Sequence, residues 1–149
     1  MSTDNSSSGL DDFRINIRLK LSALWASVTL CYLYCDYFEL YQPGKLQSVL
    51  AGRMDPMGPT TQGVLFGAAA LLAVPALMVA LSLLLAPRLC RVLNLAFGVL
   101  FTLIMLAILP RVWLFYQFFA TVEIIITCSI VWQAWKWPRS SHESTGRAA

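Results

Sequence analysis

The stretch that decides the fold runs from Gln62 to Leu85, QGVLFGAAALLAVPALMVALSLLL, and it contains no charged residue. A helix needs about 20 largely apolar residues to cross the hydrocarbon core of a bilayer, so this stretch is long enough. Lipid offers no hydrogen-bond partners to an exposed backbone, which favours a helix for any single crossing segment. The sequence therefore predicts a membrane-spanning helix at about 62–85.

Three further apolar stretches predict three more spans, at about 21–41, 92–109 and 113–137. Short breaks at Ala86-Pro87-Arg88 and at Pro110-Arg111 force the helices that they join to run antiparallel. The composition agrees, because 58% of the 149 residues are hydrophobic and 13% are charged, whereas a soluble domain carries about 25% charged residues. We expect an all-α integral membrane domain at 19–137, a four-helix bundle that runs up and down.

Lysine and arginine predict the orientation of this bundle, since they are retained on the cytoplasmic side. With the N-terminus inside, the outer side holds Lys45, Arg53 and Arg111. The cytoplasmic side then holds the other eight: Arg14, Arg18, Lys20, Arg88, Arg91, Lys136, Arg139 and Arg147. We therefore predict that both ends are cytoplasmic. The polar tails, 1–18 and 138–149, are expected to be disordered because they lack apolar residues for a core.

The longest loop, about Gln42–Thr61, is predicted to lie outside. Within it, four apolar residues recur at helical spacing: Leu46, Val49, Leu50 and Met54. This spacing is typical of a short amphipathic helix on the outer membrane surface. An irregular loop is the alternative interpretation.

Polar and small residues indicate which face of each span looks into the bundle, because lipid-facing positions need only be apolar. Spacings of three and four place such residues on one face of the first span: Ser22, Trp25, Thr29, Tyr32, Asp36 and Glu39. The fourth span carries Tyr116, Ala120, Glu123 and Thr127 in the same spacing, and the third offers Asn94 and Gly98. We expect these stripes to face one another.

In the second span, Gly63 and Gly67 form a G-x-x-x-G pair, and Ala70 follows one turn later. Small residues let helix backbones approach closely. We interpret the pair as close packing within the monomer, with a dimer face as the alternative. Pro75 is expected to kink this helix.

Asp36, Glu39 and Glu123 lie within the predicted spans, where acids are costly and mark functional candidates. Asp36 and Glu39 are expected to pair with Arg111, or with Arg53 folding back from the loop. Glu123 lies deeper, so we expect it to be protonated much of the time and hydrogen-bonded to a polar neighbour. The candidates for that polar site are Tyr32, Tyr116, Thr127 and Asn94.

Two interpretations of these acids remain open. In the first, Glu123 is a proton or cation site in a small transporter, with Asp36 as an outer relay. In the second, the acids are structural: an ion pair near the surface, and a neutral acid in a hydrogen-bond network.

Other function classes find little support in the sequence. The single histidine, His142, lies in the C-terminal tail, so no metal or cofactor is expected. Cys31 and Cys35 are four residues apart on one helix, which does not suit a disulfide and argues against membrane disulfide oxidases. No catalytic constellation is recognisable, and we expect no enzyme. The net charge of +3 is too small and scattered to indicate a nucleic-acid partner.

Several short motifs resemble those of a known family when they are taken in order. They are KLSALW (Lys20–Trp25) followed by Tyr34, Asp36 and Pro43-Gly44; TQG (Thr61–Gly63) followed by Gly67-Ala68-Ala69; and Glu123-Ile124 followed by WQAWKW (Trp132–Trp137). The series, from Leu19 to Trp137, resembles small four-span bacterial membrane proteins catalogued as a domain of unknown function. The resemblance implies a four-helix membrane bundle and no assigned activity. A broader likeness to DoxX-type proteins concerns architecture alone.

Together these observations predict a multi-pass protein of the bacterial plasma membrane. Its expected role is either proton- or cation-coupled transport, or that of a non-catalytic accessory subunit of a membrane complex. The lipid bilayer is its expected environment, and its expected partner is a second copy or another membrane protein.

Overall fold

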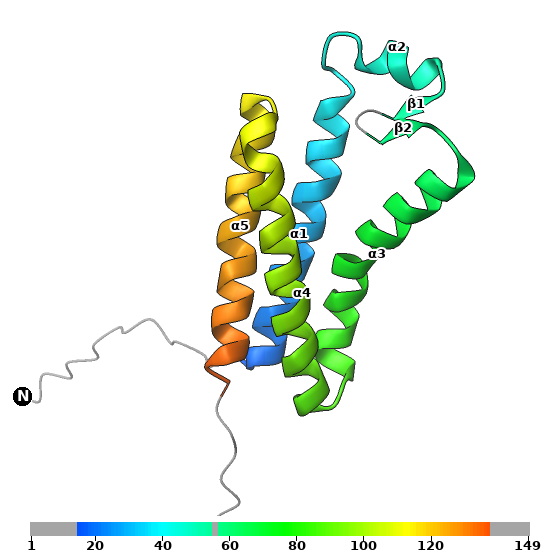
Figure 1. Ribbon diagram of the computed structural model, residues 1–149. Helices are drawn as coiled ribbons and strands as arrows, with labels where there is room; N and C mark the ends of the chain where they lie inside the picture. Colours follow the sequence, from blue (N-terminus) through cyan, green and yellow to red (C-terminus); the bar gives the residue numbers. More distant parts are fainter. Residues whose placement is uncertain (1–14, 55–56, 138–149) are drawn as a thin grey trace, which may run out of the picture.

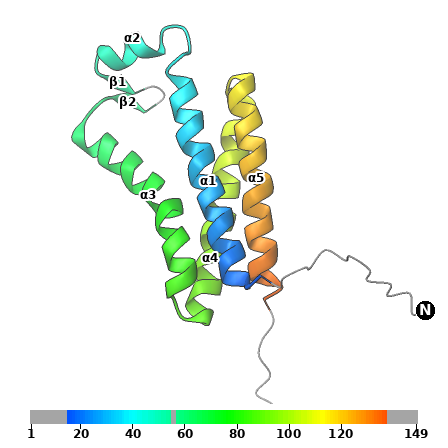
Figure 2. The same cartoon turned by 180° about the vertical axis from the view of Figure 1, so that it is seen from behind.

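Residues 15–54 and 57–137 are described by a computed structural model, apart from the side chain of Arg111. Four helices of 22 or 23 residues make up most of this part: α1 (Ile17–Glu39), α3 (Gln62–Leu84), α4 (Pro87–Ile108) and α5 (Leu114–Trp135). Figures 1 and 2 show them running up and down beside one another. The described residues are thus mostly helical, as the sequence predicted.

Three of these helices, α3, α4 and α5, are long and apolar enough to cross a membrane. They mark the chain as a membrane protein, as the sequence predicted. Among the described residues, α1 does not join them, although it has the same length. Its composition is less apolar, and Arg18, Lys20, Asp36 and Glu39 lie near its two ends.

Local signals in the sequence explain where the long helices begin. The Asn16 side chain accepts a hydrogen bond from the Arg18 backbone N–H at 3.0 Å and so caps α1. The Thr61 hydroxyl accepts one from the Val64 N–H at 3.3 Å and caps α3. Pro87 opens α4, because the first turn of a helix does not need the N–H that proline lacks. The helix α4 therefore begins at Pro87, before the predicted start of the third span at 92.

Between α1 and α3 the chain forms a short helix and a minimal hairpin. Gly44 adopts a positive φ of 82° directly before α2 (Lys45–Leu50). Two short strands follow, β1 (Arg53–Met54) and β2 (Gly58–Pro59), and they pair antiparallel. The predicted short helix is confirmed, although it spans six residues and ends before Met54. Leu46 and Leu50 on α2 are exposed.

The helix α3 is bent, and its first half leans away from the rest of the molecule (Figures 1 and 2). Pro75 lies inside the helix, where its ring displaces the preceding turn and removes one backbone hydrogen bond. The second half packs on α1: the Ser22 hydroxyl donates to the Val79 carbonyl at 2.8 Å. The Arg18 guanidinium donates to the Leu83 carbonyl at 3.2 Å. The predicted kink is therefore present.

The small residues of α3 lie in the half that leans outward. Gly63, Gly67 and Ala70 are all exposed, and a Cβ added at Gly67 would meet no atom within 4 Å. Our interpretation that this G-x-x-x-G pair packs within the monomer is therefore wrong. The bend at Pro75 is the physical reason, because it carries these residues away from α1. The alternative, a dimer face, stays a prediction.

The core lies between α1, α4 and α5, with α5 packed against both of the other helices. Trp25 and Tyr32 of α1 each meet the ring of Phe101 of α4 edge-on, with ring centroids 6.0 Å apart. A glycine permits the close approach of α4 to α5, because a Cβ at Gly98 would lie 2.8 Å from Cγ2 of Val131. This core holds α1 and α5 in the positions that form the candidate site.

Candidate intramembrane polar site

The carboxyl group of Glu123 is buried near the middle of α5. Glu123 belongs to the inward-facing stripe of that helix and is 2% exposed. Its Oε2 atom has no hydrogen-bond partner among the described residues, and neither has the hydroxyl of Tyr32, which is also buried. Buried polar atoms are nearly always hydrogen-bonded, so two orphaned atoms in one region need an explanation.

Several polar side chains share the surroundings of Glu123. The side chains close enough to interact electrostatically with the Glu123 carboxyl group include those of Tyr32 and Cys35, on α1, and that of Tyr116, on α5. The Asp36 carboxyl group also lies within this range. We call Tyr32, Cys35, Tyr116 and Glu123 the outer cluster. The structure thus brings together three of the predicted site residues, with Asp36 beside them.

Asn94 and Thr127 do not serve as partners of the Glu123 side chain. The Thr127 hydroxyl donates to the backbone carbonyl of Glu123 at 2.8 Å and accepts from the Thr102 hydroxyl at 2.7 Å. Our expectation of a hydrogen bond from Tyr, Thr or Asn to the Glu123 carboxyl is therefore not met among the described residues. The reason is local for Thr127, because a threonine in a helix readily bonds the carbonyl one turn earlier.

Asn94 instead organises a second cluster at the other end of the bundle. Its Oδ1 accepts from the indole N–H of Trp25 at 2.8 Å, and its Nδ2 donates to the Cys90 carbonyl at 2.8 Å. The Ser82 hydroxyl lies 3.4 Å from Nδ2. We call Trp25, Ser82, Cys90 and Asn94 the inner cluster. The ring of Phe101 contacts one residue of each cluster edge-on, Trp25 and Tyr32.

The predicted pairing of Glu39 with Arg53 needs correction, whereas the pairing of either acid with Arg111 stays a prediction. The carboxylate of Glu39 pairs with the ammonium of Lys45 at 2.6 Å, and it makes no ion pair with Arg53. The turn at Pro43-Gly44 reverses the chain and returns Lys45 to the end of α1. Asp36 is exposed and makes no ion pair or hydrogen bond with the described residues. The side chain of Arg111 lies outside the described part of the chain.

Ser82 and Cys90 are not among the site residues that the sequence predicted. The short connection between α3 and α4 could have pointed to these residues, because it places Ser82 within reach of Asn94. The described residues contain no group of three or more metal-binding side chains, and the four cysteines are free thiols.

A family model matches residues 11–144 of this chain, and its description is a family of unknown function, DUF6326. The chain belongs to this family. DUF6326 has no assigned activity, so membership gives no role to Glu123 or to any other residue. No curated protein and no solved structure matches the chain. The likeness to DoxX-type proteins therefore stays a prediction.

Proposed function

We propose that this protein is a four-span protein of the bacterial plasma membrane that carries protons or other cations through a site centred on Glu123. One observation carries the proposal: a carboxyl group 2% exposed, halfway along a membrane-spanning helix, has an oxygen without a hydrogen-bond partner in the described structure. An ionisable residue placed inside a membrane is a functional candidate by default.

The energetic cost argues against a purely structural role. An acid at the centre of a spanning helix costs about 2.5–3.5 kcal/mol on insertion scales. A buried polar atom without a partner costs about 1–3 kcal/mol more. A carboxyl group that stabilised the bundle would recover this cost through hydrogen bonds, and Oε2 of Glu123 makes none with the described residues. A proton or cation that binds and leaves would account for an acid at this position.

The residues around Glu123 suggest a route by which a cation reaches its carboxyl group from one side of the membrane. Asp36 is exposed on α1, between the Glu39–Lys45 ion pair and the outer cluster. A cation arriving at Asp36 then has Tyr32 and Glu123 as its next polar groups. On the other side, the ring of Phe101, which contacts both Tyr32 and Trp25, is proposed as the barrier between Glu123 and the inner cluster. In the proposed cycle this barrier opens in a second conformation.

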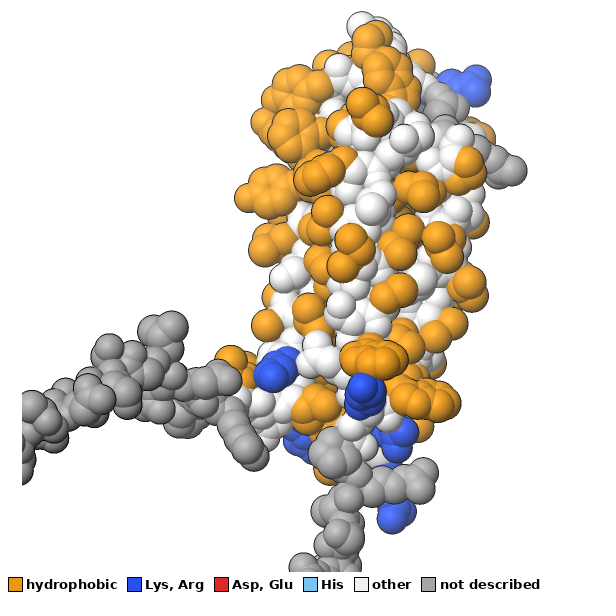
Figure 3. Space-filling view, turned by 90° about the vertical axis from the view of Figure 1, so that its left-hand side faces the viewer, with side chains coloured by type: hydrophobic (Ala, Val, Ile, Leu, Met, Phe, Trp, Pro, Cys, Tyr) orange, Lys and Arg blue, Asp and Glu red, His pale blue; other side chains and the backbone are white. Residues whose placement is uncertain are grey.

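Charge supports an orientation with both termini in the cytoplasm. Five described basic residues occur where α1 and α4 begin and α3 and α5 end: Arg18, Lys20, Arg88, Arg91 and Lys136. Figure 3 shows lysine and arginine side chains gathered at that end. Lys45 and Arg53 lie at the other end. Since positive charge is retained inside, α1 is proposed as the fourth span, which runs outward beside the other three.

The proposal is tested with Glu123→Gln in reconstituted vesicles. The vesicles contain a pH-sensitive dye, and an imposed membrane potential drives protons inward. We expect acidification faster than in protein-free vesicles, and we expect Glu123→Gln to reduce it to the protein-free rate. Glu39→Gln is the matched control, because that acid already has Lys45 as a partner.

Two outcomes would contradict the proposal. The first is a Glu123→Gln variant that folds normally and carries protons like the unmodified protein. The second is an unmodified protein that moves neither protons nor sodium or potassium ions above the protein-free rate.

A second candidate function, an accessory subunit of a membrane complex, draws on a different observation. The small residues of the outward-leaning half of α3, Gly63, Gly67 and Ala70, are exposed and leave room for a neighbouring helix. Crosslinking from Leu65 in native membranes distinguishes the two functions. A subunit is expected to capture a different protein, whereas a transporter is expected to capture mainly a second copy.

A further inference from the structure

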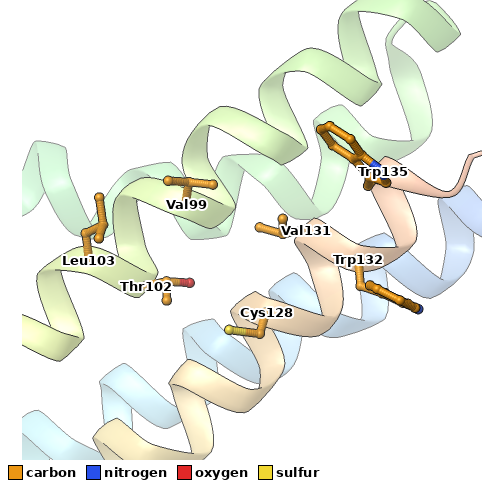
Figure 4. Close-up of a pocket in the computed structure, with 7 residues that line it drawn as sticks. All are labelled: Val99, Thr102, Leu103, Cys128, Val131, Trp132 and Trp135. Atoms are coloured by element: carbon orange, nitrogen blue, oxygen red, sulfur yellow. The ribbon is translucent and has the colours of Figure 1, made fainter.

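Two shallow grooves run along the outward face of α5. The first has a volume of about 410 Å³ and lies between α4 and α5 (Figure 4). Its lining residues are Val99, Thr102, Leu103, Cys128, Val131, Trp132 and Trp135. The second, of about 560 Å³, is lined by Ile124, Ile125, Cys128, Ser129, Trp132 and Gln133. Cys128 and Trp132 line both grooves, so they form a ridge between them.

The close approach of α4 to α5 explains the first groove. Gly98 lets the two helices meet without a side chain between them. The next positions toward the surface, Val99 and Thr102, are small, whereas Trp132 and Trp135 are large and stand at one end of the groove (Figure 4). Both tryptophans are more than half exposed. The result is an apolar groove that ends at two indole rings.

Positive charge lies at that same end. The ammonium of Lys136 sits 4.0 Å from the centre of the Trp132 ring. The guanidinium of Arg91 donates to the backbone carbonyls of Ala134 and Trp135, at 3.0 and 3.1 Å. Lys136 has no carboxylate partner among the described residues. Viewed from the α5 side, hydrophobic side chains cover much of the height, and the basic ones gather below them (Figure 3).

We infer that these two grooves hold one anionic phospholipid. Its two acyl chains lie on either side of the Cys128–Trp132 ridge, and its phosphate group meets the ammonium of Lys136. Any apolar face in a bilayer is covered by acyl chains, so apolar grooves alone select no lipid. The selection comes from a cation placed where the two grooves converge, because basic groups at a helix end bind anionic headgroups.

The chemistry of the groove ends favours a lipid over a helix of another protein. Tryptophan rings favour the headgroup region of a membrane. A lysine ammonium close to such a ring is positioned for a phosphate at that depth, whereas a packed apolar helix would leave the charge unpaired. The inference is independent of transport through Glu123, whose side chain is buried on the opposite face of α5.

Mass spectrometry of the intact protein tests the inference. The chain is reconstituted in nanodiscs with equal amounts of phosphatidylglycerol and phosphatidylcholine and then released into the instrument. We expect one phosphatidylglycerol molecule to be retained per chain in preference to phosphatidylcholine. Lys136→Gln is expected to reduce this preference several-fold, toward equal retention of the two lipids.

A matched pair of variants tests the place of binding. Val99→Trp fills the first groove, whereas Leu100→Trp adds the same side chain at a neighbouring position that lines neither groove. The two residues are 46% and 44% exposed, so both variants are expected to fold, which circular dichroism checks. Retention is expected to fall several-fold in Val99→Trp alone. Equal retention of the two lipids by the unmodified protein, equal effects of the two tryptophans, or capture of a second chain in place of lipid would overturn the inference.

Discussion

The buried polar side chains of this protein are of two kinds. Asn94 uses both ends of its amide, because Trp25 donates to its oxygen and its nitrogen donates to a backbone carbonyl. Glu123 and Tyr32 each keep an unpartnered atom among the described residues. A satisfied buried group makes a structure rigid, whereas an unsatisfied one costs free energy in a medium of low dielectric constant. The first kind therefore suits a structural role, and the second suits binding.

Replacing Asn94 by leucine tests the structural role of the inner cluster. The variant leaves the buried indole N–H of Trp25 without its acceptor. We expect the free energy of unfolding to fall by about 1–3 kcal/mol, the cost of one unsatisfied buried donor. Denaturant titration in detergent micelles, followed by tryptophan fluorescence, measures this change. Ser27→Ala is the control, because that exposed hydroxyl bonds the carbonyl of its own helix, and an equal loss there would refute the prediction.

Gly98 and Gly67 make a matched pair for a second prediction. A methyl group at Gly98 would lie 2.8 Å from Cγ2 of Val131, a β-branched residue with little rotamer freedom in a helix. We expect Gly98→Ala to lower the free energy of unfolding by about 1–3 kcal/mol through overpacking. At Gly67 the methyl group meets no atom within 4 Å, so Gly67→Ala is expected to be neutral or slightly stabilising. Thermal unfolding in one detergent compares the two, and a more harmful change at Gly67 would contradict us.

For individual residues, the sequence could predict which face of a helix a side chain lies on, but not which residues it contacts. The spacing of Ala120, Glu123 and Thr127 correctly indicated one buried face of α5. It could not tell that Thr127 bonds its own helix, or that Asn94 and Glu123 belong to different clusters. Helical spacing fixes the direction of a side chain about the axis. Its neighbours depend on the vertical offset between helices, which the loops and the packing of residues such as Phe101 determine.

Among the elements, α3 differs most from a straight spanning helix. Its second half packs on α1 through Ser22 and Arg18, and its first half has no such contacts with described side chains. Pro75 separates the halves. The limits of this helix were predictable, since 62–85 was expected and Gln62–Leu84 is observed. The direction of its bend was not, because a proline marks the position of a kink and packing decides where the helix turns.

Pro75→Ala tests whether the proline causes the outward lean. Alanine restores the missing backbone N–H, so we expect a straighter α3 with its first half closer to α1. Spin labels at Leu33 and Leu65, two exposed residues of α1 and α3, measure the change as a shorter distance by electron resonance. Leu33 paired with Leu77, beyond the proline, is the control pair. An unchanged distance between Leu33 and Leu65 would show that other contacts maintain the lean.

For the whole molecule, orientation in the membrane is the property that the positive residues predict. We expect Gln47→Cys, on α2, to react with a membrane-impermeant maleimide in intact cells. Arg88→Cys, at the opposite end in α4, is expected to react only after the membrane is permeabilised. The unmodified protein gives the background from its own four cysteines. Labelling of Arg88→Cys from outside would reverse the proposed orientation.

The connection between α3 and α4 has a consequence for biosynthesis. Leu85 and Ala86 are all that separate the two helices, and each helix is apolar enough to cross a bilayer. Lipid tolerates no open backbone at its centre, so a connection this short has to stay at one surface. We therefore expect the newly made chain to insert α3 and α4 together, as one antiparallel hairpin. If synthesis had reached only the end of α3, the unfinished chain would still have to cross the bilayer in the opposite direction with α4.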